Sequence, residues 1–234
     1  MFKKISLLVV LIFTINSCTK DVVKISKKDS YFLTVSVGNG NNGNVYLQRL
    51  STPTEVDSTE IENGVAHFKG KVVTPERYLI TIEGFFGGKM IVLENDSITV
   101  NIKNKDLINS KITGSKLNDE LLRVQKVSEK IYNQIDALFP DMQRARLEND
   151  ATKLQVISAK MTLIEQENIN YNFDYAKENP DSFISAMILS DLSKRDSIDR
   201  KKVTNSYNSL TDNIKKSIDA QKVAAFLKEI TSKN

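Results

Sequence analysis

The hydrophobic pattern of this chain changes its period near Gly114, and this change constrains the fold more than any other feature. Before that residue, short apolar runs alternate with polar residues, as they do on a half-buried strand. After it, apolar residues recur every three or four positions, as they do on an amphipathic helix. A period of two followed by a period near 3.6 indicates an α+β chain in which the strands come first and the helices second.

Residues 31–114 are predicted to form an antiparallel β-sandwich or barrel, because six or seven short strands are separated by turns rich in Gly, Asn and Pro. The Asn-Gly run at 38–44 and the polar triplet at 94–96 are each predicted to close a hairpin, and Asn63-Gly64 to form a tight turn. The first strand should bury Leu33, Val35 and Val37. The predicted strands are 31–37, 45–50, 56–61, 65–72, 77–83, 89–93 and 97–102.

Residues 115–234 are predicted to form a helical domain. Asn118 should cap a first helix that ends near Pro140, and a long second helix follows. Its seam repeats every seven residues, which favours either a coiled coil between two chains or a hairpin with the first helix. Pro140 lies between the two helices and favours the hairpin. The seam residues are Leu147, Ala151, Leu154, Ile157 or Ser158, Met161, Ile164, Asn168, Tyr171 and Tyr175.

The predicted end of the second helix is Asn179-Pro180, after which Asp181 or Ser182 can cap a third helix. This third helix is apolar on a broad face and should be buried. One or two amphipathic helices are expected over residues 193–234. Their inward side chains should be Val203, Tyr207, Leu210, Ile214, Ile218, Val223, Leu227 and Ile230.

Residues 1–17 read as a secretory signal peptide: Lys3 and Lys4 precede an apolar run at 5–15. The run is too short to span a bilayer, which takes about 20 apolar residues. Cys18 follows directly, which resembles a bacterial lipoprotein signal, in which that cysteine is lipidated and becomes the first residue. We therefore expect a palmitate-type anchor on Cys18 and a polar tether over residues 18–30. Cleavage without lipidation is the alternative.

The composition narrows the chemistry of the chain. Cys18 is the sole cysteine, so a lipidated Cys18 leaves no thiol for a disulfide, a CxxC redox motif or a nucleophile. The basic residues are scattered and the net charge is only +4, which does not favour a nucleic-acid surface. No catalytic set of residues stands out, so we expect neither enzymatic activity nor a cofactor.

Two groups of candidate metal ligands are expected to be ordinary strand residues. His67 is the only histidine and falls within a predicted strand, so a metal site or a catalytic triad would have to use it alone. Four acidic residues gather around the third strand but lack the spacing of a calcium loop, and an exposed strand face explains them. These acids are Glu55, Asp57, Glu60 and Glu62.

Several motifs together resemble a β-rich domain of unknown function that lies N-terminal to thioredoxin-like domains in bacterial envelope lipoproteins. Residues 57–64 read DSTEIENG, residues 67–72 read HFKGKV, residues 114–120 read GSKLNDE and residues 178–182 read ENPDS. This order and spacing extend the resemblance over residues 31–232. It implies an envelope location and a thiol–disulfide context, but the CxxC of the thioredoxin part is missing, and no family catalytic residue has a matching position.

The expected function is that of a lipid-anchored, non-catalytic envelope module that docks onto a partner protein, in the outer membrane and on either of its faces. One alternative is an accessory to a separate thioredoxin-like thiol–disulfide oxidoreductase. Another is a ligand-binding β module, perhaps for glycan, although sugar sites favour stacking aromatics and this chain has no Trp. The candidate aromatic residues for such a site are Tyr31, Tyr46, Phe85 and Phe86.

Overall fold

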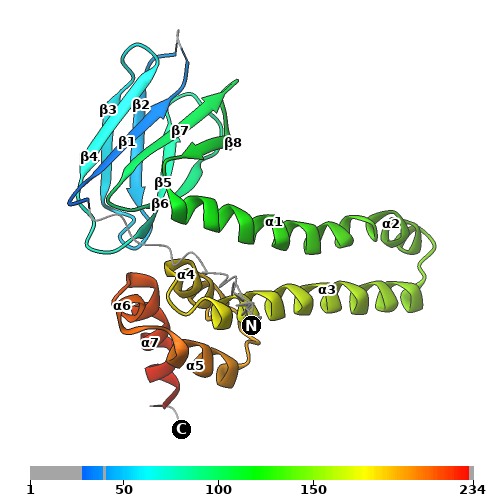
Figure 1. Cartoon of the computed structure of the whole chain (residues 1–234). Coiled ribbons are helices and arrows are strands. Elements are labelled where there is room, and N and C mark those ends of the chain that lie inside the picture. Colours follow the sequence, from blue (N-terminus) through cyan, green and yellow to red (C-terminus); the bar gives the residue numbers. More distant parts are fainter. Residues whose placement is uncertain (1–27, 39–40, 232–234) are drawn as a thin grey trace, which may run out of the picture.

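A computed structural model describes residues 28–38 and 41–231 of the 234-residue chain. Within the described residues a β-sandwich comes first, and the helices α1 to α7 follow it (Figure 1). The strands end at Thr113 and the helices begin at Lys116. The change from strand to helix therefore occurs where the hydrophobic period changes, as predicted.

Two four-stranded sheets make up the sandwich. Their strand orders are β4-β1-β7-β8 and β3-β2-β5-β6. All pairs are antiparallel except β1 with β7, which is parallel. Each of the seven predicted strands is present within two residues of its expected ends. The strands are β1 (Tyr31–Ser36), β2 (Asn44–Arg49), β3 (Val56–Glu60), β4 (Val65–Gly70), β5 (Glu76–Ile82), β6 (Lys89–Leu93), β7 (Ser97–Lys103) and β8 (Asp106–Thr113).

The core of the sandwich lies between the two sheets and is filled by alternate residues of each strand. Leu33, Val35 and Val37 are buried there, as predicted, and Val45 and Ile80 face them from the second sheet. Full burial of such a side chain contributes about 1.5–3 kcal/mol. The alternation of apolar residues along each strand therefore indicates which residues face the core.

Two predicted hairpins are wrong. β1 and β2 lie in different sheets, and so do β6 and β7, so the loops at 38–44 and 94–96 carry the chain across the sandwich. Turn residues indicate where the chain reverses but not which strands become neighbours. The hairpins that the structure does contain are β2–β3, β5–β6 and β7–β8.

The predicted turn at Asn63-Gly64 is confirmed. Both residues have positive φ, 51° and 78°, and Glu62 and Val65 exchange two backbone hydrogen bonds around them. This geometry is that of a type I′ turn. It joins β3 to β4, which belong to different sheets.

The eighth strand, β8, has no counterpart among the predicted strands. Its inward residues are interrupted: Leu107 and Ser110 are buried, whereas the two residues between them are exposed. The pairing of β7 with β8 also shifts near Asn101. Buried and exposed residues therefore do not alternate strictly in this segment. It forms a strand because it pairs with β7.

The helical hairpin is confirmed. α1 and α3 pack against each other within one chain, with the short α2 at their far end (Figure 1). Pro140 lies in the first turn of α2, where a missing N–H has no cost. The helices are α1 (Lys116–Asp136), α2 (Phe139–Leu147), α3 (Ala151–Glu178), α4 (Phe183–Leu192), α5 (Arg200–Ser209), α6 (Asp212–Lys215) and α7 (Ile218–Thr231).

The heptad seam is shorter than predicted. Asn149 has a positive φ of 52° and separates α2 from α3, so Leu147 is 85 % exposed instead of lying in the seam. From Ile157 onward the seam contains buried residues, Ile157, Ile164 and Asn168. Asn168 is buried among them and donates a hydrogen bond to the Tyr132 hydroxyl of α1 (3.2 Å).

The predicted cap of α1 is also wrong. Ser115 is the N-cap, and its hydroxyl accepts a hydrogen bond from the backbone N–H of Asn118 (3.1 Å). The Asn118 side chain instead pairs with the backbone of Val92 in edge strand β6. It accepts from the Val92 N–H (2.9 Å) and donates to the Val92 carbonyl (2.6 Å). The amide thus takes the place of a neighbouring strand and joins α1 to the sheet.

The last helices form a second core around α4. Ser182 caps α4, as predicted, and nearly all of its side chains are buried. Three helices follow instead of one or two, because Leu210 ends α5 in an extended conformation and α6 is a single turn. Val203, Leu210, Ile214 and Val223 face inward, as predicted, and belong to the same buried cluster as the side chains of α4.

Candidate functional site

The predicted lipid-anchor residue, Cys18, and the signal peptide before it lie outside the described residues. Within the described part of the chain, no helix is long and apolar enough to cross a membrane. The anchor at Cys18 remains an expectation, and the candidate site described below lies within the described residues.

The candidate metal ligands are on exposed strand surfaces, as predicted. His67 lies on β4, where its ring stacks on Phe32 at 5.2 Å and its Nδ1 is 3.2 Å from the Thr34 hydroxyl. The acids at 55, 57, 60 and 62 are exposed on or beside β3. Among the described residues, no three His, Cys, Asp or Glu side chains form a group that could hold a metal ion.

The four aromatic residues considered for glycan do not form one platform. Tyr31 is buried in the sandwich core, and Tyr46 is half-buried on β2. Phe85 and Phe86 lie in the β5–β6 turn, where the Lys105 ammonium sits over the Phe85 ring, 5.3 Å from its centre. A pocket of about 410 Å³ beside Phe85 is lined mainly by loop residues.

The hairpin α1–α3 carries the main concentration of exposed apolar side chains. Of the eleven large apolar side chains exposed in the described residues, six lie on this hairpin. The hairpin extends sideways, away from both the sandwich and the α4–α7 helices (Figure 1). These six residues are Leu122, Val127, Phe139, Leu147, Val156 and Leu163.

A groove of about 630 Å³ runs along one side of the hairpin, between α1 and α3. Ile131, which is buried, and Tyr171, which is half-buried, lie at its base. Burial raises the pKa of the Tyr171 hydroxyl above its ordinary value. The lining residues are Val127, Lys130, Ile131, Gln134, Glu167, Asn170, Tyr171 and Asp174.

The two rims of the groove carry opposite charge. Arg123 and Lys130 lie seven residues apart on α1, and Glu167 and Asp174 lie seven apart on α3. Residues seven apart share one face of a helix. None of the four forms an ion pair with another described residue, although Gln134 donates a hydrogen bond to Glu167 (3.3 Å).

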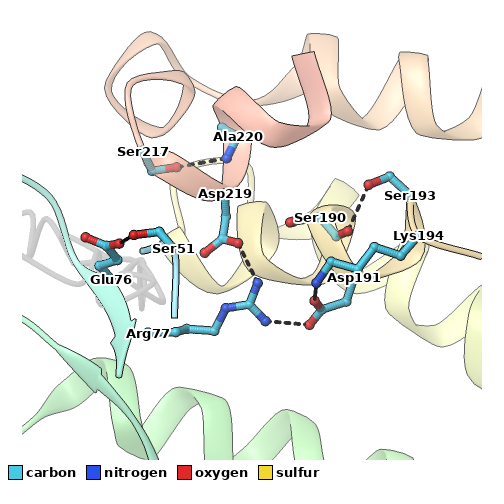
Figure 2. A network of polar contacts seen from close by, with 10 residues as sticks. All are labelled: Ser51, Glu76, Arg77, Ser190, Asp191, Ser193, Lys194, Ser217, Asp219 and Ala220. Carbon is cyan, nitrogen blue, oxygen red and sulfur yellow. Dashed lines mark hydrogen bonds and ion pairs between the residues drawn. The ribbon is translucent and has the colours of Figure 1, made fainter. Parts of the chain in front are cut away.

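A network of ion pairs joins the sandwich to the helices (Figure 2). Arg77 reaches from β5 to Asp219 of α7 (2.5 Å) and to Asp191 of α4 (2.7 Å). The side chain of Asp219 is only 5 % exposed, and that of Arg77 13 %. Burial alone would lower the pKa of Arg77, but the two carboxylates outweigh it and raise that pKa. The arrangement is suited to holding the two parts together.

Beside this network, Glu76 is buried and accepts a hydrogen bond from the Ser51 hydroxyl (Figure 2). Arg49 pairs with Glu76 at 3.3 Å. A small cleft of about 110 Å³ lies between Ser51 and the start of α7. Arg77 and Asp219, which pair across the sandwich–helix boundary, are among its lining residues, so we interpret the cleft as part of that joint.

A second polar cluster lies where α1 meets the sandwich. Glu94, at the end of β6, accepts hydrogen bonds from the Ser115 hydroxyl (2.6 Å) and the Leu117 N–H (3.4 Å). Burial raises the pKa of the Glu94 carboxyl, and the nearby Asp96 and Glu120 raise it further; the hydrogen bonds oppose this only in part.

Glu120 is the second buried carboxylate of this joint. Its Oε1 accepts hydrogen bonds from the Tyr175 hydroxyl and from the Ser182 hydroxyl, whereas its Oε2 has no described partner. Burial of Tyr175 and its bond to Glu120 raise the pKa of that hydroxyl far above its ordinary value. The cluster thus ties α1 to α3 and to the start of α4.

We expect Glu94→Gln to stabilise the protein at pH 7. Folding raises the pKa of this carboxyl, so its ionisation lowers the free energy of unfolding. This cost is complete above the raised pKa and disappears as the pH falls to the ordinary value. Glutamine keeps the acceptor and removes the charge. Melting curves between pH 5 and 8 should show a higher Tm for the variant and a weaker pH dependence; each kcal/mol corresponds to roughly 2–4 °C for a chain of this size.

The matched control for this variant is Glu129→Gln on the exposed side of α1, which should leave Tm within about 1 °C, since surface changes cost under about 0.5 kcal/mol. A Tm for Glu94→Gln below that of the wild type at pH 7 would show that the charge of Glu94 stabilises the joint.

The comparison with known families identifies the sandwich. Residues 31–121 match the family model of a domain of unknown function, DUF4369. This match confirms the resemblance over residues 31–121, whereas the motif at 178–182 lies outside it. The DUF4369 region covers all eight strands and ends inside α1, at residue 121, so the groove and the later helices lie largely beyond it. The chain matches no curated protein.

The groove and its charged rims were not among the sequence predictions. The signal for them was present, because Arg123, Lys130, Glu167 and Asp174 follow the same seven-residue repeat as the seam. Periodicity alone does not show which exposed faces of two helices lie side by side. That juxtaposition required the packing of α1 on α3.

Proposed function

We propose that this chain is a lipid-anchored protein of the bacterial cell envelope, held by an acyl group on Cys18, that binds a partner protein through the hairpin α1–α3. The DUF4369 region and the α4–α7 helices serve as the base from which the hairpin extends. The proposal includes no catalytic role.

The exposed apolar surface of the hairpin is the observation that carries this proposal. Leu163 is 70 % exposed on α3, and Val127, which lines the groove on α1, is 41 % exposed. Apolar side chains gathered on one surface of a folded protein mark an interaction site more often than apolar residues scattered singly. They are also placed on rigid helices, so little conformational entropy is lost on binding.

Site-specific crosslinking in intact cells tests the partner-binding part. A photoreactive amino acid at Leu163 should give one discrete adduct in the envelope fraction, and the same amino acid at Val56, which is exposed on β3, should not. Introducing Val127→Asp should abolish the adduct at position 163. Identical adducts from both positions, or none at Leu163, would refute docking on the hairpin.

Metabolic labelling tests the anchor separately. We expect the wild type to incorporate a clickable palmitate and Cys18→Ala to lose both the label and its association with membranes. More than one acyl chain is needed for stable attachment, at about 0.8 kcal/mol per buried methylene. Labelling that persists in the Cys18→Ala protein would contradict a lipid anchor at this residue.

A second candidate is an accessory to a separate thioredoxin-like oxidoreductase, which the resemblance of the sequence motifs to redox-associated lipoproteins favours. Mass spectrometry of the adduct at Leu163 discriminates the two. A partner with a CxxC motif, together with a changed thiol status of envelope proteins in a deletion strain, would support this role. An adduct with a protein of another kind and an unchanged thiol status would rule it out.

A further inference from the structure

The groove between α1 and α3 has the shape that remains when a third helix is absent from a helical bundle. Two antiparallel helices pack with Ile131 and Tyr171 at their junction, and the valley above them follows the helix axes. An amphipathic helix laid in such a valley buries its apolar face against both walls. An extended strand would find no free sheet edge here.

Exposed apolar residues continue along the hairpin beyond the groove. Val127 lies on the α1 wall. On α3, Leu163 and Val156 are seven residues apart and extend the stripe toward the far end of the hairpin. A ligand helix that follows this stripe needs apolar side chains every three or four residues over several turns.

The rims decide which helix fits. Lys130 lines the groove on α1, with Arg123 seven residues before it on the same face of the helix, whereas Glu167 and Asp174 line it on α3. All four are exposed, and none is neutralised by an ion pair with a described residue. Charges that repeat every seven residues beside an apolar seam are the feature by which helices of a bundle choose their partners.

On the basis of the function proposed above, we propose that this groove binds an amphipathic α-helix of the partner protein, with acidic side chains on its flank next to α1 and basic side chains on its flank next to α3. Reversing the direction of the helix exchanges its two flanks. The rims therefore require one acidic and one basic flank, and they set the direction of the bound helix.

Three synthetic peptides test this inference on the purified full-length protein in detergent. Each has about 21 residues, three heptads, with leucine in the seam. The mixed peptide has Glu on one flank and Lys on the other; the remaining two have only Glu or only Lys on both flanks. We expect the mixed peptide to bind the wild type about tenfold more tightly than either of the others, because two exposed ion pairs replace two repulsions.

Reversing the charge of the α3 rim should change which peptide binds most tightly. In the variant Glu167→Lys/Asp174→Lys both rims are basic, and the all-Glu peptide should become the tightest ligand. The control Glu129→Lys/Asp136→Lys makes the same charge change at two exposed residues of α1, also seven apart, outside the groove lining. It should keep the wild-type order. Circular dichroism should show unchanged helix content in both variants.

Three results would overturn the inference: the wild type binds all three peptides alike or none of them, the control variant changes the order as the rim variant does, or light scattering shows a dimer whose Leu163 residues crosslink between copies. These results are distinct from failure of the proposed function. A specific adduct at Leu163 in cells, combined with indifferent peptides, would keep the partner and reject the charge-matched helix.

Discussion

Arg77→Met is expected to lower the free energy of unfolding by about 3–5 kcal/mol, because it leaves the buried carboxylate of Asp219 without its counter-ion. Arg77 is the one residue of β5 that reaches both α4 and α7 through ion pairs in the described structure (Figure 2). For a chain of this size the loss corresponds to a fall in Tm of roughly 6–20 °C. Urea unfolding followed by circular dichroism measures it.

The other partner of Arg77 provides the control. Asp191 is 52 % exposed, so Asp191→Asn leaves no buried charge and should cost under about 1 kcal/mol. The double variant Arg77→Met/Asp219→Asn should recover part of the loss, since it removes the uncompensated charge. If Arg77→Met and Asp191→Asn cost the same, Asp219 is not held by a buried ion pair.

Among Gly→Ala substitutions at the described glycines, Gly114→Ala is expected to lower the free energy of unfolding most. Gly114 has a φ of 84°, and a Cβ built on it would lie 2.1 Å from the backbone carbonyl oxygen of Ser97. Backbone cannot move aside as a flexible side chain can. We expect a loss of more than about 4 kcal/mol, in the range of exceptional point mutations, and a large fall in soluble yield.

A second glycine separates the clash from the backbone strain. Gly84 also has a positive φ, 73°, but a Cβ there would have no neighbour within 4 Å. Gly84→Ala should therefore cost only the strain of a left-handed residue, about 1–2 kcal/mol. Chemical denaturation of the two variants compares them, and equal losses would mean that β7 and the start of α1 are not as close as described.

Gly114 also marks what local sequence can and cannot reveal. The period change around it predicts the joint between strands and helices, and seven strands and the hairpin follow from alternation and heptads. Its approach to Ser97, by contrast, depends on β7 lying next to β8. Local patterns record which side of an element is buried, because burial repeats along the element, but they do not record which element covers it.

The errors have the same cause. The loops at 38–44 and 94–96 have hairpin composition, yet they cross between sheets, since β1 is held by β4 and β7 and not by β2. Asn118 is a residue type that often caps helices, yet its side-chain amide binds the edge of β6, where it pairs with both the N–H and the carbonyl of Val92.

The amino-acid sequence by itself determined the order and kind of most elements and the inward face of most strands, and it predicts a signal and an anchor at Cys18. Tertiary structure alone decided the sheet pairing, the partners of Arg77 and the charged groove of the hairpin. The physical reason is distance along the chain: Arg77 meets Asp191 and Asp219 across 114 and 142 residues. Such contacts form only after the chain has folded, and no periodic pattern encodes them.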